Sequence, residues 1–138
     1  VQVLYHENGR SVAELPRDYV GLNAFPYSPH LGFWLAYYGF RAAGITALAT
    51  GGGKIMGTQK IMDAMERLKV NVIAIIPGYG YHLLREAIKQ KKDFSNLKQV
   101  IFGAERVSPA FREKIIYILF CLIGVIGNIG FLARVCKI

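Results

Sequence analysis

The chain has 138 residues, of which 53% are hydrophobic and 19% are charged, so it can build one domain with a real core and is not expected to be disordered. Seventeen Lys and Arg against nine Asp and Glu give a net charge of +8, which suits an anionic partner. Nucleic acid is not expected, because the densest basic run, Lys89–Lys92, has no interleaved aromatic side chains. We interpret this run as a solvated helix end.

The cysteines and the first residues bear on the cellular compartment. Cys121 and Cys136 lie in an apolar segment without histidines at ligand spacing, so we expect neither a zinc site nor a disulfide framework, and we favour a reduced, cytoplasmic protein. The beginning of the chain does not have the pattern of a signal peptide. It also lacks an initiator Met, which suggests that the chain begins inside a longer one.

The first third of the chain predicts strands around one helix. Residues 1–20 indicate a strand and an irregular connection, and 19–26 a further strand. Two prolines predict a turn over 26–30. A buried helix rich in aromatic and small residues is expected over 31–43, and Gly44 should end it.

A short buried strand is expected over 45–50, followed by a flexible turn at Gly51–Gly53. The spacing of these glycines and Lys54 does not fit a phosphate-binding loop, so a plain strand-to-helix turn is favoured. Thr58 should cap a helix that runs to about residue 68. One apolar stripe on this helix contains Ile61, Met62, Met65 and Leu68.

Two apolar runs, 70–76 and 97–102, frame an amphipathic helical segment at 80–91, which is the pattern of a βαβ unit. Ser108 and Pro109 then predict the start of another helix. Strand and helix alternate about four times along the chain. We therefore predict an α/β fold with a mostly parallel sheet flanked by helices.

In proteins with parallel sheets, ligands bind at the edge of the sheet that is formed by the carboxyl ends of the strands. The turns expected at 77–80 and 103–105 follow two such strands, and they are candidate ligand walls.

The segment 115–133 has no charged residue and approaches the length that spans a bilayer. It is interrupted by Gly124, Gly127, Asn128 and Gly130. This punctuation favours a helix end, a turn and a strand in a soluble protein over a membrane anchor.

The order of several motifs indicates a family. Asn23–Tyr27 leads into an aromatic helix, a Gly-rich turn follows, a strand ends in Pro77–Tyr79, and Phe102–Glu113 reads Phe-Gly-Ala-Glu-Arg-Val-Ser-Pro-Ala-Phe-Arg-Glu. From about residue 23 to 114 the chain resembles the phenylacetate-CoA ligase branch of the acyl-adenylate-forming, AMP-binding ligases. The resemblance covers about two thirds of the chain.

The resemblance implies part of the large N-terminal domain of an enzyme that activates a carboxylic acid as acyl-AMP, using ATP and magnesium, and transfers it to coenzyme A. A flat apolar acid such as an aryl acetate would suit its aromatic walls. The implied nucleotide-binding residues are Gly103, Ala104, Glu105, Gly130 and Phe131. The implied walls of the acyl pocket are Phe25, Tyr27, Phe33, Pro77, Gly78 and Tyr79.

The chain departs from the family's pattern where members carry a Tyr-Gly-x-Thr-Glu loop. Here Asn128–Ala133 lacks the Tyr, Thr and Glu, and Leu and Ala offer no oxygen ligand for magnesium. The family's phosphate loop, ribose-binding aspartate and lid lysine are also missing. The three histidines, His6, His30 and His82, form no nucleophile motif. We therefore assign no catalytic or metal-binding residue.

We expect residues 1–138 to be a single-domain ligase fragment that is inactive alone: 1–20 a lead-in and strand, 21–114 repeated βα units, and 115–138 a helix end, turn and strand with a degenerate loop. The alternatives are a non-catalytic module that binds a nucleotide or aryl acid, and a membrane-tethered protein. Sheet edges and apolar helix faces left uncovered would favour homo-oligomers.

Overall fold

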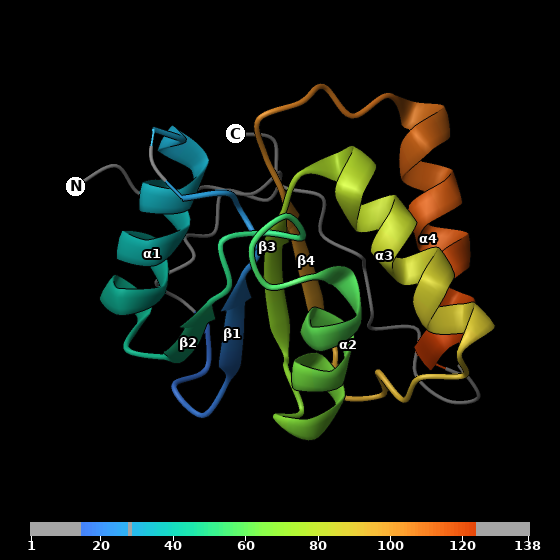
Figure 1. The fold of residues 1–138 in the computed structure, drawn as a ribbon, viewed down its shortest axis with the longest axis horizontal. Helices are drawn as coiled ribbons and strands as arrows, with labels where there is room; N and C mark the ends of the chain where they lie inside the picture. Colours follow the sequence, from blue (N-terminus) through green and yellow to red (C-terminus); the bar gives the residue numbers. More distant parts are fainter. Residues whose placement is uncertain (1–14, 28, 124–138) are drawn as a thin grey trace.

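The computed structural model describes residues 15–27 and 29–123, which form a parallel sheet with helices on both faces (Figure 1). The described strands are β1 (Val20–Asn23), β2 (Thr46–Ala49), β3 (Val72–Ile75) and β4 (Gln99–Phe102). The helices are α1 (Leu31–Ala43), α2 (Thr58–Arg67), α3 (Pro77–Lys89) and α4 (Pro109–Ile123). The predicted α/β fold with a parallel sheet flanked by helices is confirmed.

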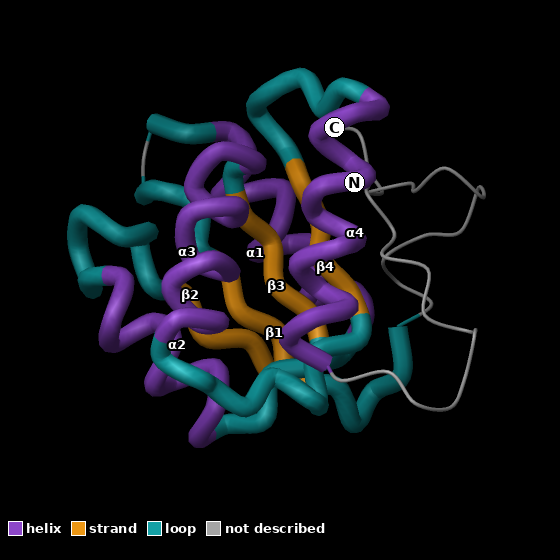
Figure 2. The backbone as a smooth tube through the Cα atoms, turned by 90° about the vertical axis from the view of Figure 1, so that its right-hand side faces the viewer, coloured by secondary structure: helices purple, strands orange, loops and turns teal. Residues whose placement is uncertain are grey.

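The sheet has the strand order β2-β1-β3-β4, so the chain first moves outward from β1 to one edge and then continues on the other side of β1. Helix α1 covers one face with a core centred on Phe33 and Phe40. Helices α2, α3 and α4 cover the opposite face, as Figures 1 and 2 show. The reversal creates a crevice between the carboxyl ends of β1 and β3, which is where doubly wound sheets bind ligands.

Burial along the strands follows their position in the sheet. All four residues of β3 are buried, as predicted for a central parallel strand. The expected burial of 45–50 is wrong for part of that segment, because β2 is an edge strand in which Thr46 and Ala47 are exposed. An edge strand lacks a neighbour on one side, and its small side chains are not covered.

Helix α1 is likewise only half buried, although its composition predicts a buried helix. Phe33, Ala36 and Phe40 face the sheet, whereas Trp34 and Tyr38 are 43% and 55% exposed. Composition misleads here because the exposed aromatic side chains pack edge-to-face and in stacks on one another. Because these aromatic side chains are exposed, self-association through this face stays a prediction.

The beginnings of two helices differ from the sequence-based expectation. Helix α3 starts at Pro77 rather than Gly80, because proline fits the first helical position, so the expected turn at 77–80 is the first helical turn. The predicted Thr58 cap of α2 is wrong, because Thr58 is the first helical residue, Gly57 is at the N-cap position, and no side chain caps this helix. The predicted Ser108 cap of α4 is confirmed, since its hydroxyl accepts a hydrogen bond from the Phe111 N–H at 3.2 Å.

Lys92 is not the solvated side chain expected for the basic run at 89–92. Its ammonium lies 2.8 Å from Asp63 Oδ1 and 2.9 Å from Glu66 Oε2, and its side chain is only 17% exposed. The hydrogen bond from Lys92 lowers the pKa of Asp63. The pKa of Glu66 is lowered first by a hydrogen bond from the Asp93 N–H and then by Lys92. The charge cluster thus ties α2 to the segment after α3.

None of the helices in residues 15–27 and 29–123 is long and apolar enough to cross a membrane. Helix α4 contains the beginning of the uncharged segment 115–133. The strand predicted within residues 1–20, except for its last residues, lies outside the described residues. So do Gly130, Phe131 and the turn and strand predicted after the helix.

Gly80 brings α3 close to β4, and we expect Gly80→Ala to destabilise the fold. A Cβ at this position would lie 2.7 Å from Phe102 Cε1 and 3.0 Å from Ile75 Cγ2. Overpacking of this kind costs about 1–3 kcal/mol, which exceeds the roughly 1 kcal/mol that Ala gains over Gly in a helix. Urea denaturation measures the difference. Gly78→Ala on the same helix is the control, because its Cβ meets only Glu105 Oε2 at 3.4 Å, and equal losses in both variants would contradict the packing argument.

The Lys92 cluster should make stability depend on pH in a defined direction. Because the pKa values of Asp63 and Glu66 are lowered in the folded state, their contribution is present above their ordinary pKa values and is lost as the pH falls through the lowered ones. Because the pKa of Lys92 is raised, its contribution is lost only as the pH rises through that raised value.

Lys92→Met should therefore flatten the acid side of the stability profile, measured as the urea midpoint at a series of pH values. Lys91→Met removes the same charge at a neighbouring exposed position and should leave the slope unchanged. A Lys92→Met profile parallel to that of the wild type would show that the cluster does not couple to folding.

Candidate functional site

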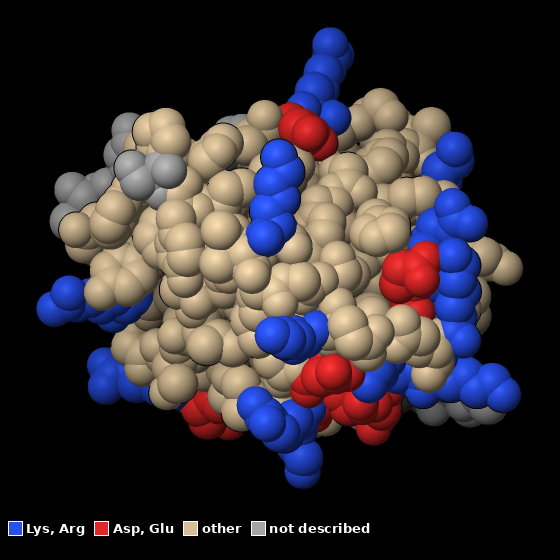
Figure 3. Space-filling view, viewed as in Figure 1, with Lys and Arg blue, Asp and Glu red and all other residues tan. Residues whose placement is uncertain are grey.

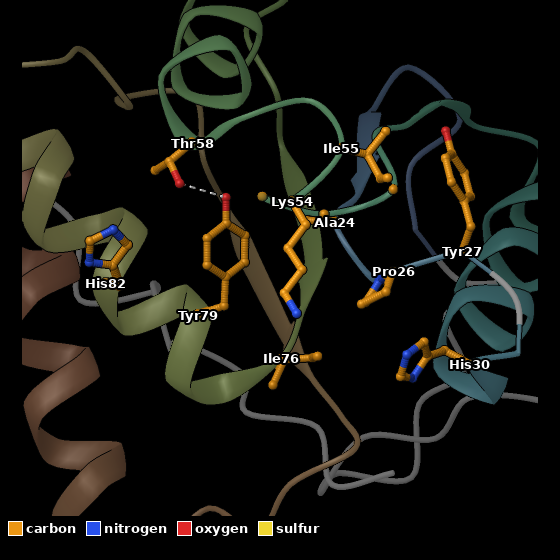
Figure 4. A pocket seen from close by; sticks show the side chains of 13 residues that line it. Ala24, Pro26, Tyr27, His30, Lys54, Ile55, Thr58, Ile76, Tyr79 and His82 are labelled. Atoms are coloured by element: carbon orange, nitrogen blue, oxygen red, sulfur yellow. Dashed lines mark hydrogen bonds between the residues drawn. The ribbon is translucent and has the colours of Figure 1, made fainter.

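A cavity of about 580 Å³ opens at the crevice between β1 and β3, on the carboxyl edge of the sheet. Segments that follow β1, β2 and β3 supply its walls, and α2 and α3 begin beside it (Figure 4). The lining residues are Ala24, Pro26, Tyr27, His30, Gly51, Gly52, Gly53, Lys54, Ile55, Thr58, Ile76, Tyr79 and His82. Residues 27 and 79 are thus brought together from distant parts of the sequence because parallel strands end at one edge.

Two buried polar side chains fix the loops that form this edge. Asn23 donates from Nδ2 to the carbonyl of Phe33 at 2.9 Å and accepts from the Phe25 N–H at 3.2 Å. Thr50 donates from both its N–H and its hydroxyl to the Asn23 carbonyl. The same hydroxyl accepts from the Gly52 N–H at 3.3 Å. Because unpaired polar groups are costly to bury, these bonds hold the loops after β1 and β2 in one arrangement.

The glycine segment after β2 is closely packed between two tyrosine rings, which corrects the expectation of a flexible turn. A Cβ at Gly51 would overlap the ring of Tyr27, and one at Gly53 would lie 2.5 Å from the Tyr79 hydroxyl. Gly51 and Gly52 also have φ values of 69° and 78°, a region that favours glycine. The three glycines are therefore required by the close approach of both rings and by the backbone conformation.

Hydrogen bonds orient the two tyrosines. The Tyr27 hydroxyl donates to the Ala49 carbonyl at 3.1 Å, and the Tyr79 and Thr58 hydroxyls are 3.1 Å apart. Burial raises the pKa of the Tyr79 phenol, and the hydrogen bond with Thr58 offsets part of that rise. The Tyr79 phenol is therefore neutral at neutral pH and is held in place by its hydrogen bond with Thr58.

Apart from the tyrosines, the ionisable side chains that line the cavity are basic. Lys54, His30 and His82 line the cavity, and no Asp or Glu is among its lining residues. Helices α1, α2 and α3 have no acidic side chain in their first turns, so their positive ends are not neutralised from within the helix. On the face shown in Figure 3, the acidic side chains sit beside basic ones near its margins. The cavity suits an anionic ligand with an apolar body.

Glu105 links the loop after β4 to the start of α3. Its Oε2 accepts a hydrogen bond from the Gly78 N–H at 3.1 Å, so the predicted walls at 77–80 and 103–105 do meet at one edge. Ala104 has a φ of 69° and is exposed, which presents backbone at the surface of this loop. In the part of the chain that is described, no three His, Cys, Asp or Glu side chains gather as a metal-binding group.

The structure brings some predicted wall residues to the cavity and not others. Tyr27 and Tyr79 line it, whereas Phe25 and Phe33 lie in the core under α1. Pro77 is buried and Gly78 is exposed at the start of α3, next to the lining but not part of it.

The predicted nucleotide residues Gly103, Ala104 and Glu105 are outside the lining, and Gly130 and Phe131 are outside the described residues. Sequence reasoning missed Lys54, Ile55, Thr58 and Ile76 as lining residues. The available signal was that Lys54 and Thr58 directly follow glycines and that Ile76 directly follows β3.

Comparison of the sequence with protein-family profiles and with curated proteins gives no match. The fold, in contrast, is similar to parts of the solved structures of a CoA ligase, an adenylation domain and an amide bond synthetase. A 2-hydroxyisobutyryl-CoA ligase in complex with 2-HIB-AMP has a TM-score of 0.72 and 20% identity over 91% of this chain and 25% of that chain.

The adenylation domain of a keto acid-selecting NRPS module, bound to keto acyl adenylate, has a TM-score of 0.63 and 17% identity over 90% of this chain and 23% of its own. The amide bond synthetase McbA from Marinactinospora thermotolerans has a TM-score of 0.59 and 19% identity over 76% of this chain and 20% of its own. The chain thus spans about a quarter of these structures or less. Identities this low show a shared fold, which is an α/β fold found in CoA ligases and adenylation enzymes.

The hydrogen bond between Thr58 and Tyr79 should be measurable as a coupling between the two side chains. In a double-mutant cycle of Thr58→Val and Tyr79→Phe, we expect a coupling free energy of about 0.5–1.5 kcal/mol in urea denaturation. The matched cycle of Thr58→Val with Tyr27→Phe should give none, because Tyr27 bonds to Ala49 instead. Equal coupling in both cycles would contradict the assigned pairing.

Proposed function

We propose that the chain is part of an acyl-adenylate-forming ligase similar to phenylacetate-CoA ligases, in which the cavity at the β1–β3 crevice holds an aromatic carboxylic acid. The observation that carries the proposal is the cavity itself, which has tyrosine rings on two sides and no acidic side chain in its lining. The fold shared with a CoA ligase and an adenylation domain supports it. The parent enzyme would form acyl-AMP and pass the acyl group to coenzyme A.

In this proposal the nucleotide binds beside the carboxylic acid. Loop 103–105 lies next to the start of α3, because Glu105 accepts a hydrogen bond from the Gly78 N–H. The next residue of α3, Tyr79, lines the cavity. A planar adenine on the exposed backbone of Ala104 would put the phosphates of ATP or AMP toward the open edge of the sheet, where the N-terminus of α2 favours anions, whereas that of α3 already bonds to the Glu105 carboxylate.

The parent reaction of the proposed family uses magnesium. The described residues contain no cluster that fits the ion, and the position where the resemblance would put a magnesium-binding glutamate lies outside them. We derive no step through magnesium. Adenylyl transfer depends on charge neutralisation, so we expect the chain alone to bind ligands without catalysis.

A second candidate function is a binding module for a nucleotide or an aryl acid. The favouring observation is the cavity itself, whose lining residues lie between 24 and 82 and combine tyrosine rings with basic side chains. A cytoplasmic location remains part of either proposal; of the two cysteines on which it rests, Cys121 is free and exposed.

Calorimetry on the purified chain tests the proposal. We expect phenylacetate and AMP to bind, and no exchange between ATP and pyrophosphate in the presence of the acid. Ile55→Trp, which places a large side chain at the exposed rim of the cavity, should weaken phenylacetate binding at least about tenfold, or ~1.4 kcal/mol.

Ile116→Trp on the exposed face of α4 is the matched control and should not affect binding. If neither ligand binds, the proposed function is wrong. If ATP–pyrophosphate exchange is measurable, the chain is a complete catalyst and the fragment interpretation is wrong. Binding unaffected by Ile55→Trp would place the acid elsewhere.

A further inference from the structure

Lys54 is the one lysine among the lining residues of the cavity. In Figure 4 its side chain extends between Tyr79 and Pro26 toward Ile76. It carries no hydrogen bond or ion pair within the described ranges 15–27 and 29–123, unlike Lys92 and Lys89. An ammonium directed into an apolar-walled cavity without a carboxylate partner is a binding group for an anion.

The backbone around Lys54 is held in place, so its position is defined by the fold. The N–H groups of Ile55 and Met56 donate to the Gly52 carbonyl at 3.3 and 3.2 Å, and the Gly57 N–H donates to the Gly53 carbonyl at 3.1 Å. The preceding glycines are packed against Tyr27 and Tyr79. A lysine on such a closed turn loses less freedom on binding than one on an open loop.

The carboxylates of the neighbourhood are engaged elsewhere, which leaves the charge of Lys54 available. Asp63 and Glu66 hold Lys92, Glu86 holds Lys89, and Glu105 accepts from the Gly78 N–H. Because Lys54 is exposed, an ion pair with its ammonium would be screened by salt.

We propose that Lys54 recognises the carboxylate of the aromatic acid and is thereby the residue that selects acids over neutral aromatic ligands. The inference rests on the proposed function, because it assumes that the cavity holds an acid. The aromatic ring lies between Tyr27 and Tyr79, which Figure 4 shows on opposite sides of the cavity, and the carboxylate lies against the Lys54 ammonium. All three basic lining groups are exposed, but Lys54 is the one that Figure 4 places between the two tyrosines, whereas the His82 ring stacks against Tyr79 with ring centroids 6.4 Å apart.

The test compares phenylacetate with phenylacetamide, which has the same shape without the charge, by calorimetry on the purified chain. We expect the wild type to prefer the acid by about tenfold or more at low salt, and the preference to shrink as salt is added. Lys54→Met should bind both compounds equally, with the amide bound as in the wild type. Lys54→Arg should keep most of the preference.

Two control variants separate this role from general charge. Lys60→Met on α2 and Lys91→Met after α3 remove the same charge from exposed positions outside the cavity lining, and both variants should keep the preference. Circular dichroism verifies that every variant is folded. A preference retained in Lys54→Met, or lost equally in Lys60→Met, would overturn the assignment.

The results also distinguish this inference from the proposed function. If the wild type binds AMP and phenylacetate but binds the amide equally well, Lys54 is not the selector while the proposed function stands. If the wild type binds neither AMP nor either aromatic compound, both are overturned.

Discussion

The cavity depends on the close approach of two tyrosine rings to a backbone that has no side chains. Tyr27 lies against Gly51 and Tyr79 lies against Gly53, at distances that a Cβ would not allow. This contact sets the width of the crevice, orients the turn that carries Lys54, and brings the Tyr79 hydroxyl to Thr58 at the start of α2. A side chain at Gly51 or Gly53 would move a ring, and the wall would move with it.

The strand order explains why this contact occurs at the edge where a ligand can enter. Since β1 has β2 on one side and β3 on the other, the connections after β1 and β3 diverge to opposite faces and leave a crevice between them. Asn23, at the end of β1, bonds to Phe33 in the first turn of α1 and to Thr50 after β2, so it ties the segments on both sides of the crevice together. Packing, hydrogen bonding and topology therefore act on the same few residues.

The ionisable side chains in and around the cavity complement its shape in the proposed function. The described Asp and Glu side chains near the cavity are paired with a lysine or with the start of α3. The ionisable side chains in the lining are basic, apart from the tyrosines. The lining thus combines apolar walls with basic groups, and the proposed binding of an aromatic acid rests on this combination.

The sequence by itself determined the alternation of strands and helices, because hydrophobic periodicity and Gly or Pro punctuation are local signals. The span of α1, the buried β3 and the Ser108 cap followed from them. The edge position of β2, the pairing of Lys92 with Asp63 and Glu66, and the start of α3 at Pro77 did not. Only the tertiary structure decided that Lys54 and Tyr79 share one cavity while Phe25 and Phe33 belong to the core. The reason is physical: strand order and side-chain direction are set by packing between segments far apart in the chain, which no local pattern encodes.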